Sequence, residues 1–175
     1  MSGVELREVV GGEDLAAAER LADDYGRWVR SVLESEHGIA IQDPSESHLL
    51  FSDLGDLLQP PSRLYLAIVD RQPLGVAGIK HLDPSVAEIT RMFVLPEARG
   101  HGVGRELMER LIADGVAGGY TVLRLETMTW MTEAVALYRK FGFEETRSYG
   151  AREFENVRSV DPLAVFLELR LDRRG

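Results

Sequence analysis

The sequence contains no cysteine, which excludes disulfide bonds, thiolate metal sites and a cysteine nucleophile. It is also poor in basic residues, because 20 Lys and Arg stand against 29 Asp and Glu, for a formal net charge of −9. This charge differs from the basic footprint of nucleic-acid-binding proteins, so we expect no nucleic-acid partner. An acidic surface favours cationic small molecules or basic peptides, although solubility alone is the simpler explanation.

Long apolar runs are absent as well. No stretch approaches the roughly 20 apolar residues that a membrane-spanning helix needs. The first ten residues carry Glu5 and Glu8 where a signal peptide would have its apolar core. We therefore expect a cytoplasmic protein with no membrane partner. The four histidines are not spaced as metal ligands, so no metal site is expected.

At 175 residues the chain suits one domain, and its apolar patterns predict both strands and helices. Strands are expected at residues 4–10, 64–69, 74–80, 88–95, 121–127, 143–148 and 164–171. Helices are expected at residues 14–33, 45–58, 104–117 and 132–141, with Ser45 and Thr132 as N-caps of the second and fourth. Tyr25 and Trp28 fall on the apolar stripe of the first helix, where core packing is the expected role and a pocket wall the alternative.

The order of these elements predicts the topology. The three strands 64–69, 74–80 and 88–95, with a turn at residues 70–73 between the first two, are expected to run antiparallel. A helical crossover then places strand 121–127 parallel to strand 88–95. The predicted fold class is a single α/β domain with a mixed, mostly antiparallel central sheet of about six to seven strands, flanked by helices.

The chain is organised around residues 87–118. A strand-forming run is stopped by Pro96 and followed by Arg99-Gly100-His101-Gly102-Val103-Gly104, and an amphipathic helix starts there. Glycines let the backbone approach a ligand closely, and a helix N-terminus favours negative charge, so the turn suits a phosphate or pyrophosphate. Glycine spacing alone leaves a plain tight turn equally open.

Two nucleotide-binding motifs can be excluded. No Gly-Lys-Ser/Thr follows, so the turn is not a P-loop. The glycines at positions 100, 102 and 104 also miss the G-x-G-x-x-G spacing of dinucleotide-binding folds. The remaining pattern is Arg-x-x-Gly-x-Gly at the start of a helix.

Residues 92–104, MFVLPEARGHGVG, resemble the acetyl-CoA signature Arg/Gln-x-x-Gly-x-Gly/Ala of the GNAT superfamily of N-acetyltransferases. Residues 134–143, AVALYRKFGF, are similar to a second family segment, A-x-x-L-Y-x-K-x-G-F. The resemblance covers residues 64–171, which would form the acetyl-CoA-binding core of one GNAT-like domain spanning residues 1–175. Residues 1–63 would supply variable helices on the acceptor side.

Acetyl transfer from a thioester to an amine requires that the acetyl-CoA co-substrate be held and its developing oxyanion stabilised. Backbone N–H groups at residues 99–105 are expected to hold it, with added charge from Arg105. The resemblance implies that strands 88–94 and 122–127 splay apart to admit the pantetheine arm. It also assigns oxyanion stabilisation to a backbone N–H at residues 92–94. The predicted cofactor-binding residues are Met92, Phe93, Val94, Arg99, Gly100, His101, Gly102, Val103, Gly104 and Arg105.

Glu88 is the candidate catalytic base. It precedes Arg99 by eleven residues (99 − 88 = 11), the spacing of the catalytic glutamate in histone-type members of the superfamily. A carboxylate beside a partly dry cleft can have a raised pKa and accept a proton directly or through water. A solvated glutamate, or an ion pair with Arg91 or Lys80, is the alternative. Glu126 on the adjoining strand is the weaker candidate.

Tyr138 is the candidate catalytic acid, because it falls on the tyrosine that many GNAT members use to protonate the leaving thiolate. A phenol stays protonated at neutral pH and suits that role, whereas core packing on an amphipathic helix is the alternative. Met131 is a departure from the pattern, because many members carry at that position an asparagine that contacts the cofactor arm.

These features predict an acetyl-CoA-dependent N-acetyltransferase acting on a primary amine of a small molecule, by direct attack without a covalent enzyme intermediate. A protein or peptide amine acceptor, and a non-catalytic acyl-CoA-binding regulatory module, stay open. The acceptor is expected between the N-terminal helices and loop 149–162. Acidic residues that would attract a cationic acceptor there are Glu36, Asp43, Glu46 and Glu153. The apolar strand 164–171 could pair with a second copy at a sheet edge, making a homodimer possible.

Overall fold

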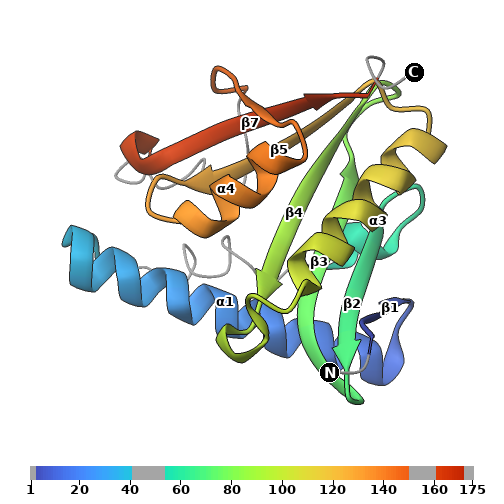
Figure 1. The fold of residues 1–175 in the computed structure, drawn as a ribbon, viewed down its shortest axis with the longest axis horizontal. Coiled ribbons are helices and arrows are strands. Elements are labelled where there is room, and N and C mark those ends of the chain that lie inside the picture. Colours follow the sequence, from blue (N-terminus) through green and yellow to red (C-terminus); the bar gives the residue numbers. More distant parts are fainter. Residues whose placement is uncertain (1–2, 41–53, 150–160, 172–175) are drawn as a thin grey trace.

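Seven strands form one mixed sheet in the order β1-β2-β3-β4-β5-β7-β6, seen in the computed structural model in Figure 1. The structure describes residues 3–40, 54–149 and 161–171. The strands are β1 (Glu5–Glu8), β2 (Arg63–Val69), β3 (Gln72–His81), β4 (Val86–Val94), β5 (Val122–Met128), β6 (Glu144–Glu145) and β7 (Ala164–Arg170). The helices are α1 (Gly12–His37), α3 (Val103–Ala117) and α4 (Thr132–Lys140), with single 3-10 turns at Gly55–Leu58, Pro96–Ala98 and Asp161–Leu163.

All neighbouring strands run antiparallel except β4 and β5, which are parallel across the α3 crossover. The predicted fold class and the predicted parallel pair are therefore confirmed. Strand β2 reads as an unbroken apolar run because both of its faces are covered. Leu64, Leu66 and Ile68 pack in the core on the α1 side, whereas the alternate residues Tyr65 and Ala67 pack on the α3 side.

The Tyr65 hydroxyl forms a small polar network within the α3-side core. It donates to Oδ2 of Asp114 at 2.6 Å and accepts from Nη2 of Arg110 at 2.9 Å. Burial, followed by the hydrogen bond to Asp114, raises the pKa of Tyr65 to about 12. The network ties β2 to α3 at a distance from the cavity described below.

The β2–β3 hairpin turns more tightly than predicted. Val69 pairs with Gln72, so the loop is Asp70 and Arg71 alone, and Pro73 already belongs to β3. Both loop residues have positive φ, 50° and 68°, the conformation whose twist matches a two-residue hairpin.

Helix α1 is longer than the predicted segment 14–33, because its polar last turn continues to His37. Gly38, in a left-handed conformation with φ 66°, then ends the helix by donating its N–H to the Leu33 carbonyl. Most of the predicted helix 45–58, including the proposed cap Ser45, lies outside the described residues. Its described end is a 3-10 turn at Gly55–Leu58.

Helix α4 corrects one predicted cap and confirms another feature. Thr132 is the first helical residue rather than the N-cap, which is Met131 and makes no side-chain capping bond. At the other end, Gly142 has φ 91° and donates to the Arg139 carbonyl, while Phe143 donates to the Tyr138 carbonyl. This pair of bonds is the Schellman motif expected of a glycine at C′.

The C-terminal strands also differ from expectation. Strand β6 is two residues long instead of 143–148, and β7 lies between β5 and β6. Strand β7 is therefore not the last strand of the sheet, although β6 pairs with it only at Leu167 and Glu168. Pairing of β7 with a second copy stays a prediction. Within the described ranges, no helix is both long and apolar enough to cross a bilayer.

Candidate active site

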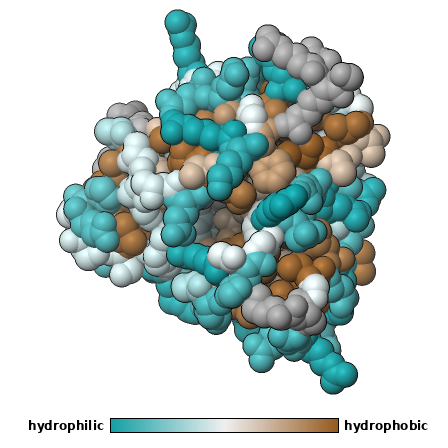
Figure 2. Space-filling view, viewed as in Figure 1, coloured by the Kyte–Doolittle hydropathy of each residue, from teal (hydrophilic) through white to brown (hydrophobic). Residues whose placement is uncertain are grey.

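Strands β4 and β5 separate partway along their length and open the sheet. Their pairing runs from Val86–Val122 to Ile89–Leu125, yet β4 continues to Val94 and β5 to Met128. A cavity of about 860 Å³ occupies the divergence and reaches α1, α3 and α4. Figure 2 shows the corresponding recess near the middle of this face. The opening confirms the predicted splaying of these two strands.

A β-bulge in β4 lies at the mouth of the opening. Gly78 pairs with Thr90 and Val76 with Phe93, so β4 has one residue more than β3. Arg91 adopts a left-handed φ of 56° there, a conformation that a non-glycine residue rarely takes inside a strand. The extra residue reverses the side-chain alternation, because a bulge shifts the register by one. Phe93 consequently packs in the α1-side core, although Ile89 packs on the α3 side.

The glycine-rich turn forms the other end of the cavity. Gly100 and Gly102 have φ of 76° and 85°, and a Cβ added at either would meet no described atom within 4 Å. These two glycines are therefore needed for backbone conformation and leave open space beside the chain. Helix α3 then begins at Val103 without a side-chain cap, so its first N–H groups are left for solvent or a ligand.

Gly104 has a different role from the other two glycines. A Cβ at this position would stand 3.2 Å from Cδ2 of Leu137 on α4. Gly104 therefore lets α3 and α4 pack closely. Of the predicted cofactor-binding residues, the cavity is lined by Met92, Phe93, Val94, Arg99, Gly100, Gly102, Val103, Gly104 and Arg105, whereas His101 is exposed and does not line it.

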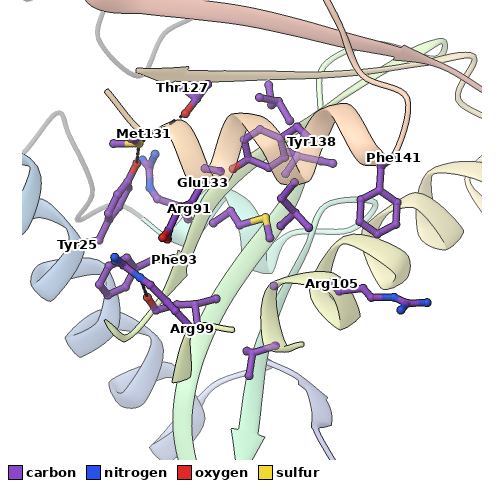
Figure 3. Close-up of a pocket in the computed structure, with 18 of the residues that line it drawn as sticks. Tyr25, Arg91, Phe93, Arg99, Arg105, Thr127, Met131, Glu133, Tyr138 and Phe141 are labelled. Atoms are coloured by element: carbon purple, nitrogen blue, oxygen red, sulfur yellow. Dashed lines mark hydrogen bonds between the residues drawn. The ribbon is translucent and has the colours of Figure 1, made fainter. Parts of the chain in front are cut away.

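Tyr138 combines the two roles weighed from the sequence. Its ring belongs to the α3-side core and leaves only 6% of the residue exposed. The side chain also lines the cavity, and Figure 3 shows its hydroxyl pointing into the space between α4 and β4. Core packing thus holds the hydroxyl in a defined place.

The two candidate bases lie differently. Glu88 is half-buried, aligned with Lys80 on β3 and Arg124 on β5, and does not line the cavity. Glu126 does line it. The difference follows from the strand pairing, since Glu88 lies where β4 and β5 are still joined and Glu126 lies beyond the last pair.

Met131, the departure from the family pattern noted in the sequence, joins three elements at the cavity. Its sulfur accepts hydrogen bonds from the Tyr25 hydroxyl at 3.8 Å and from the Thr127 hydroxyl at 3.5 Å. These dashed contacts appear in Figure 3 beside α1. The thioether therefore anchors α1 to the end of β5 and the start of α4.

Four aromatic side chains form one wall of the cavity. From the sequence, Phe93 was expected at the site, a pocket wall was the alternative role of Tyr25 and Trp28, and Trp130 was not assigned. Tyr25 stacks on Phe93 with ring centroids 5.2 Å apart, and Trp28 meets Trp130 edge-on at 5.2 Å. We call Tyr25, Trp28, Phe93 and Trp130 the aromatic wall; all four line the cavity. Tyr25 and Trp28 thus serve the core and the pocket together. The four residues come from three distant segments, so no local signal could have grouped them.

The charged residues at the cavity are mixed. Among the described residues, its lining includes the cations Arg91, Arg99, Arg105 and Lys140 and the acids Glu109, Glu126 and Glu133. Arg105 and Glu109 form an ion pair at 2.7 Å. Of the acidic residues expected to attract a cationic acceptor, Glu36 is exposed and off the cavity, and the other three lie outside the described residues.

Comparison with known proteins identifies the family of this chain. A protein from Azospirillum brasilense named IAA acetyltransferase is 37% identical over 127 residues, covering 71% of this chain and 78% of that protein. The PaiA N-acetyltransferase of Thermoplasma acidophilum, solved with coenzyme A, superposes with a TM-score of 0.72 at 19% identity and covers 97% of this chain and 99% of that one. A GNAT family acetyltransferase from Elizabethkingia anophelis, solved with acetyl-CoA bound, gives a TM-score of 0.62 at 18% identity over 98% of this chain and all of that one (100%). The profile of the acetyltransferase (GNAT) family matches residues 22–143. This chain therefore belongs to the GNAT family of acetyltransferases.

Proposed function

We propose that this protein transfers the acetyl group of acetyl-CoA to a primary amine of a small molecule, by direct attack of the amine on the thioester. The opening between β4 and β5 carries the proposal, because it joins an uncapped helix N-terminus at one end to the Tyr138 hydroxyl at the other. Relatives of the same family, and a solved structure with acetyl-CoA bound, support the choice of donor.

The residues at the turn fit the acyl donor. The N–H groups of residues 100–105 bind the pyrophosphate, where the helix dipole of α3 favours negative charge. Arg105 adds a cation at the same end of the cavity. The edge of β4 that β5 leaves unpaired receives the amide groups of the pantetheine arm, as a strand receives an added strand. A backbone N–H at residues 92–94, next to the bulge, stabilises the oxyanion that develops on the thioester carbonyl.

In the transfer step, the amine nitrogen forms a bond to the thioester carbon and the carbon–sulfur bond breaks. Tyr138 donates its hydroxyl proton to the departing thiolate, and the proton lost by the attacking amine restores the phenol through solvent. Glu126, on the cavity wall, is the better-placed acceptor for the ammonium proton, while Glu88 acts only through intervening water. The chain has no cysteine, and no serine lines the cavity among the described residues. A covalent intermediate on cysteine, or on a serine of this lining, is therefore excluded.

Replacement of the Tyr138 hydroxyl tests the proposal. Tyr138→Phe keeps the ring in the core and removes the proton donor, so kcat for thiol release should fall about 100-fold. The acetyl-CoA-induced rise in melting temperature should persist. Tyr120→Phe is the matched control, because that hydroxyl bonds Nδ1 of His81 away from the cavity. An unchanged kcat in Tyr138→Phe would show that Tyr138 is not the proton donor to the thiolate.

The same thiol-release assay distinguishes a protein or peptide acceptor from a small-molecule acceptor. Small free amines are compared, at equal amine concentration, with peptides that offer either a lysine side chain or a free N-terminal amine. Turnover confined to the peptides would contradict the proposed acceptor class. Acetyl-CoA binding without turnover of any amine would indicate a regulatory module instead.

A further inference from the structure

The acceptor side of the cavity combines flat apolar surface with a cation held in an unfavourable conformation. The aromatic wall supplies the surface, and Figure 3 shows Arg91 beside Tyr25, Phe93 and Met131, on the side of the cavity away from Phe141 and Arg105. The Arg91 side chain is half-buried, and its Nη1 donates to Oγ1 of Thr90 at 3.2 Å.

Arg91 occupies a backbone position that favours glycine. Its φ of 56° is the one positive value among described non-glycine residues outside the β2–β3 turn. A left-handed residue with a Cβ is disfavoured, and such strain collects at functional sites. A guanidinium at this costly position, facing a cavity, indicates that its side chain has a use. Its planar fork of donors matches a carboxylate.

Arg99, the second arginine on this side of the cavity, makes its contacts with the aromatic wall and the end of β4. Nε of Arg99 donates to the Val94 carbonyl at 3.1 Å, and its guanidinium lies 5.2 Å from the centre of the Trp28 ring. Arg99 therefore holds the end of β4 against α1. Arg91 lies in the bulge itself and also lines the cavity.

Trp130 provides an independent sign of a missing acceptor. Its indole Nε1 is buried, and no hydrogen-bond acceptor for it lies within the part of the chain that the structure describes. Trp130 also lines the cavity. A buried donor is normally satisfied, so an oxygen atom of a ligand is the natural partner.

We propose that the acceptor amine carries a carboxylate, bound by Arg91 and the Trp130 indole N–H, with its apolar or aromatic body against the aromatic wall. This inference rests on the proposed function and names its acceptor class as amino acids or similar aminocarboxylates. The amine of such a molecule points towards Glu126 and Tyr138, and its carboxylate towards Arg91.

The chain offers a direct probe of this site. Its two tryptophans, Trp28 and Trp130, both belong to the aromatic wall, so the entire tryptophan fluorescence reports on it. Protein saturated with CoA, which cannot transfer acetyl, is titrated with phenylalanine and with phenethylamine, the same amine without its carboxylate. Leucine and isoamylamine form a second matched pair.

Phenylalanine and leucine should each change the tryptophan fluorescence. Each should bind at least about 10-fold more tightly than its matched amine without a carboxylate, the difference in affinity expected of a charge-assisted hydrogen-bonded pair. Arg91→Gln should abolish that preference. Arg27→Gln should retain it, because Arg27 is an exposed residue of the same helix as Trp28, paired with Asp24. Equal binding of the two members of each pair, a preference that survives Arg91→Gln, or no response to any probe at millimolar concentration would overturn the inference.

The same protein preparations separate this inference from the proposed function. A normal acetyl-CoA-induced rise in melting temperature with no carboxylate preference would overturn the acceptor class alone. Absence of that rise would overturn the proposed function. In the thiol-release assay, Arg91→Gln should raise KM for phenylalanine about 10- to 100-fold, with a much smaller effect on kcat.

Discussion

The three glycines of the turn should respond differently to alanine, because the structure gives them different roles. At Gly100 and Gly102 the obstacle is a left-handed backbone, with φ of 76° and 85° and open space around an added Cβ. At Gly104 the backbone is helical, and the obstacle is a contact of 3.2 Å with Cδ2 of Leu137.

The expected costs follow from these differences. A left-handed residue with a Cβ costs about 1–2 kcal/mol, and a chain of this size loses about 2–4 °C of melting temperature per kcal/mol. Gly100→Ala and Gly102→Ala should therefore each melt about 2–8 °C lower. In Gly104→Ala the end of the Leu137 side chain can shift by a few tenths of an ångström. Alanine also gains up to about 1 kcal/mol over glycine in a helix. The net change for Gly104→Ala should be close to zero.

The assay is thermal unfolding of the four proteins with and without acetyl-CoA. The ligand-induced rise should shrink most in Gly102→Ala, because relaxing its φ turns the N–H groups at the start of α3 away from the pyrophosphate. Gly104→Ala should keep most of the rise, in line with the family signature, which admits alanine at that position. The reasoning is refuted if Gly104→Ala has the lowest melting temperature of the variants. It is also refuted if Gly102→Ala has the parent's melting temperature and the parent's acetyl-CoA-induced rise.

Two further predictions concern side chains that hold the fold around the site. Folding raises the pKa of Tyr65 from 10.0 to about 12, so the stability from its neutral hydroxyl is complete below pH 10 and is lost as the pH rises towards 12. Tyr65→Phe should cost about 1–2 kcal/mol in urea unfolding at pH 7 and should flatten the alkaline loss of stability; a parent-like fall between pH 10 and 12 would count against this account. Met131→Leu keeps the apolar volume but removes the acceptor for the Thr127 and Tyr25 hydroxyls, and should lower the free energy of unfolding by about 1 kcal/mol. If the Met131→Leu variant unfolds at the same urea midpoint as the parent, the sulfur contacts contribute nothing to the free energy of unfolding.

Features set by neighbouring residues were predictable from the sequence. The strand–turn–helix of residues 87–118 carries its own stop and start signals, and Gly142 marks the end of α4, because these depend on local backbone chemistry. Thr132 was misplaced as a cap because Met131 accepts the first helical bond, from the N–H of Val135. A threonine beside a helix start does not reveal which residue the chain will use.

Features that depend on distant pairing were not predictable. The bulge at Arg91 has no glycine or proline to announce it, and it exists because β4 has one residue more than β3 opposite it. The aromatic wall depends on the separation of β4 from β5 and on the packing of α1 against β4. The place of β7 between β5 and β6 likewise follows from tertiary packing, which a single strand pattern does not encode.

Binding of acetyl-CoA is the most direct test of the central claim. The melting temperature is measured with acetyl-CoA and, as controls, with ATP and NAD. A ligand present at 100 times its dissociation constant stabilises the folded state by about 2.7 kcal/mol, which corresponds to about 5–11 °C for a chain of this size. A rise of several degrees with acetyl-CoA alone is the predicted result. No rise at millimolar acetyl-CoA, or an equal rise with ATP or NAD, would contradict the assignment of the β4–β5 opening as an acetyl-CoA site.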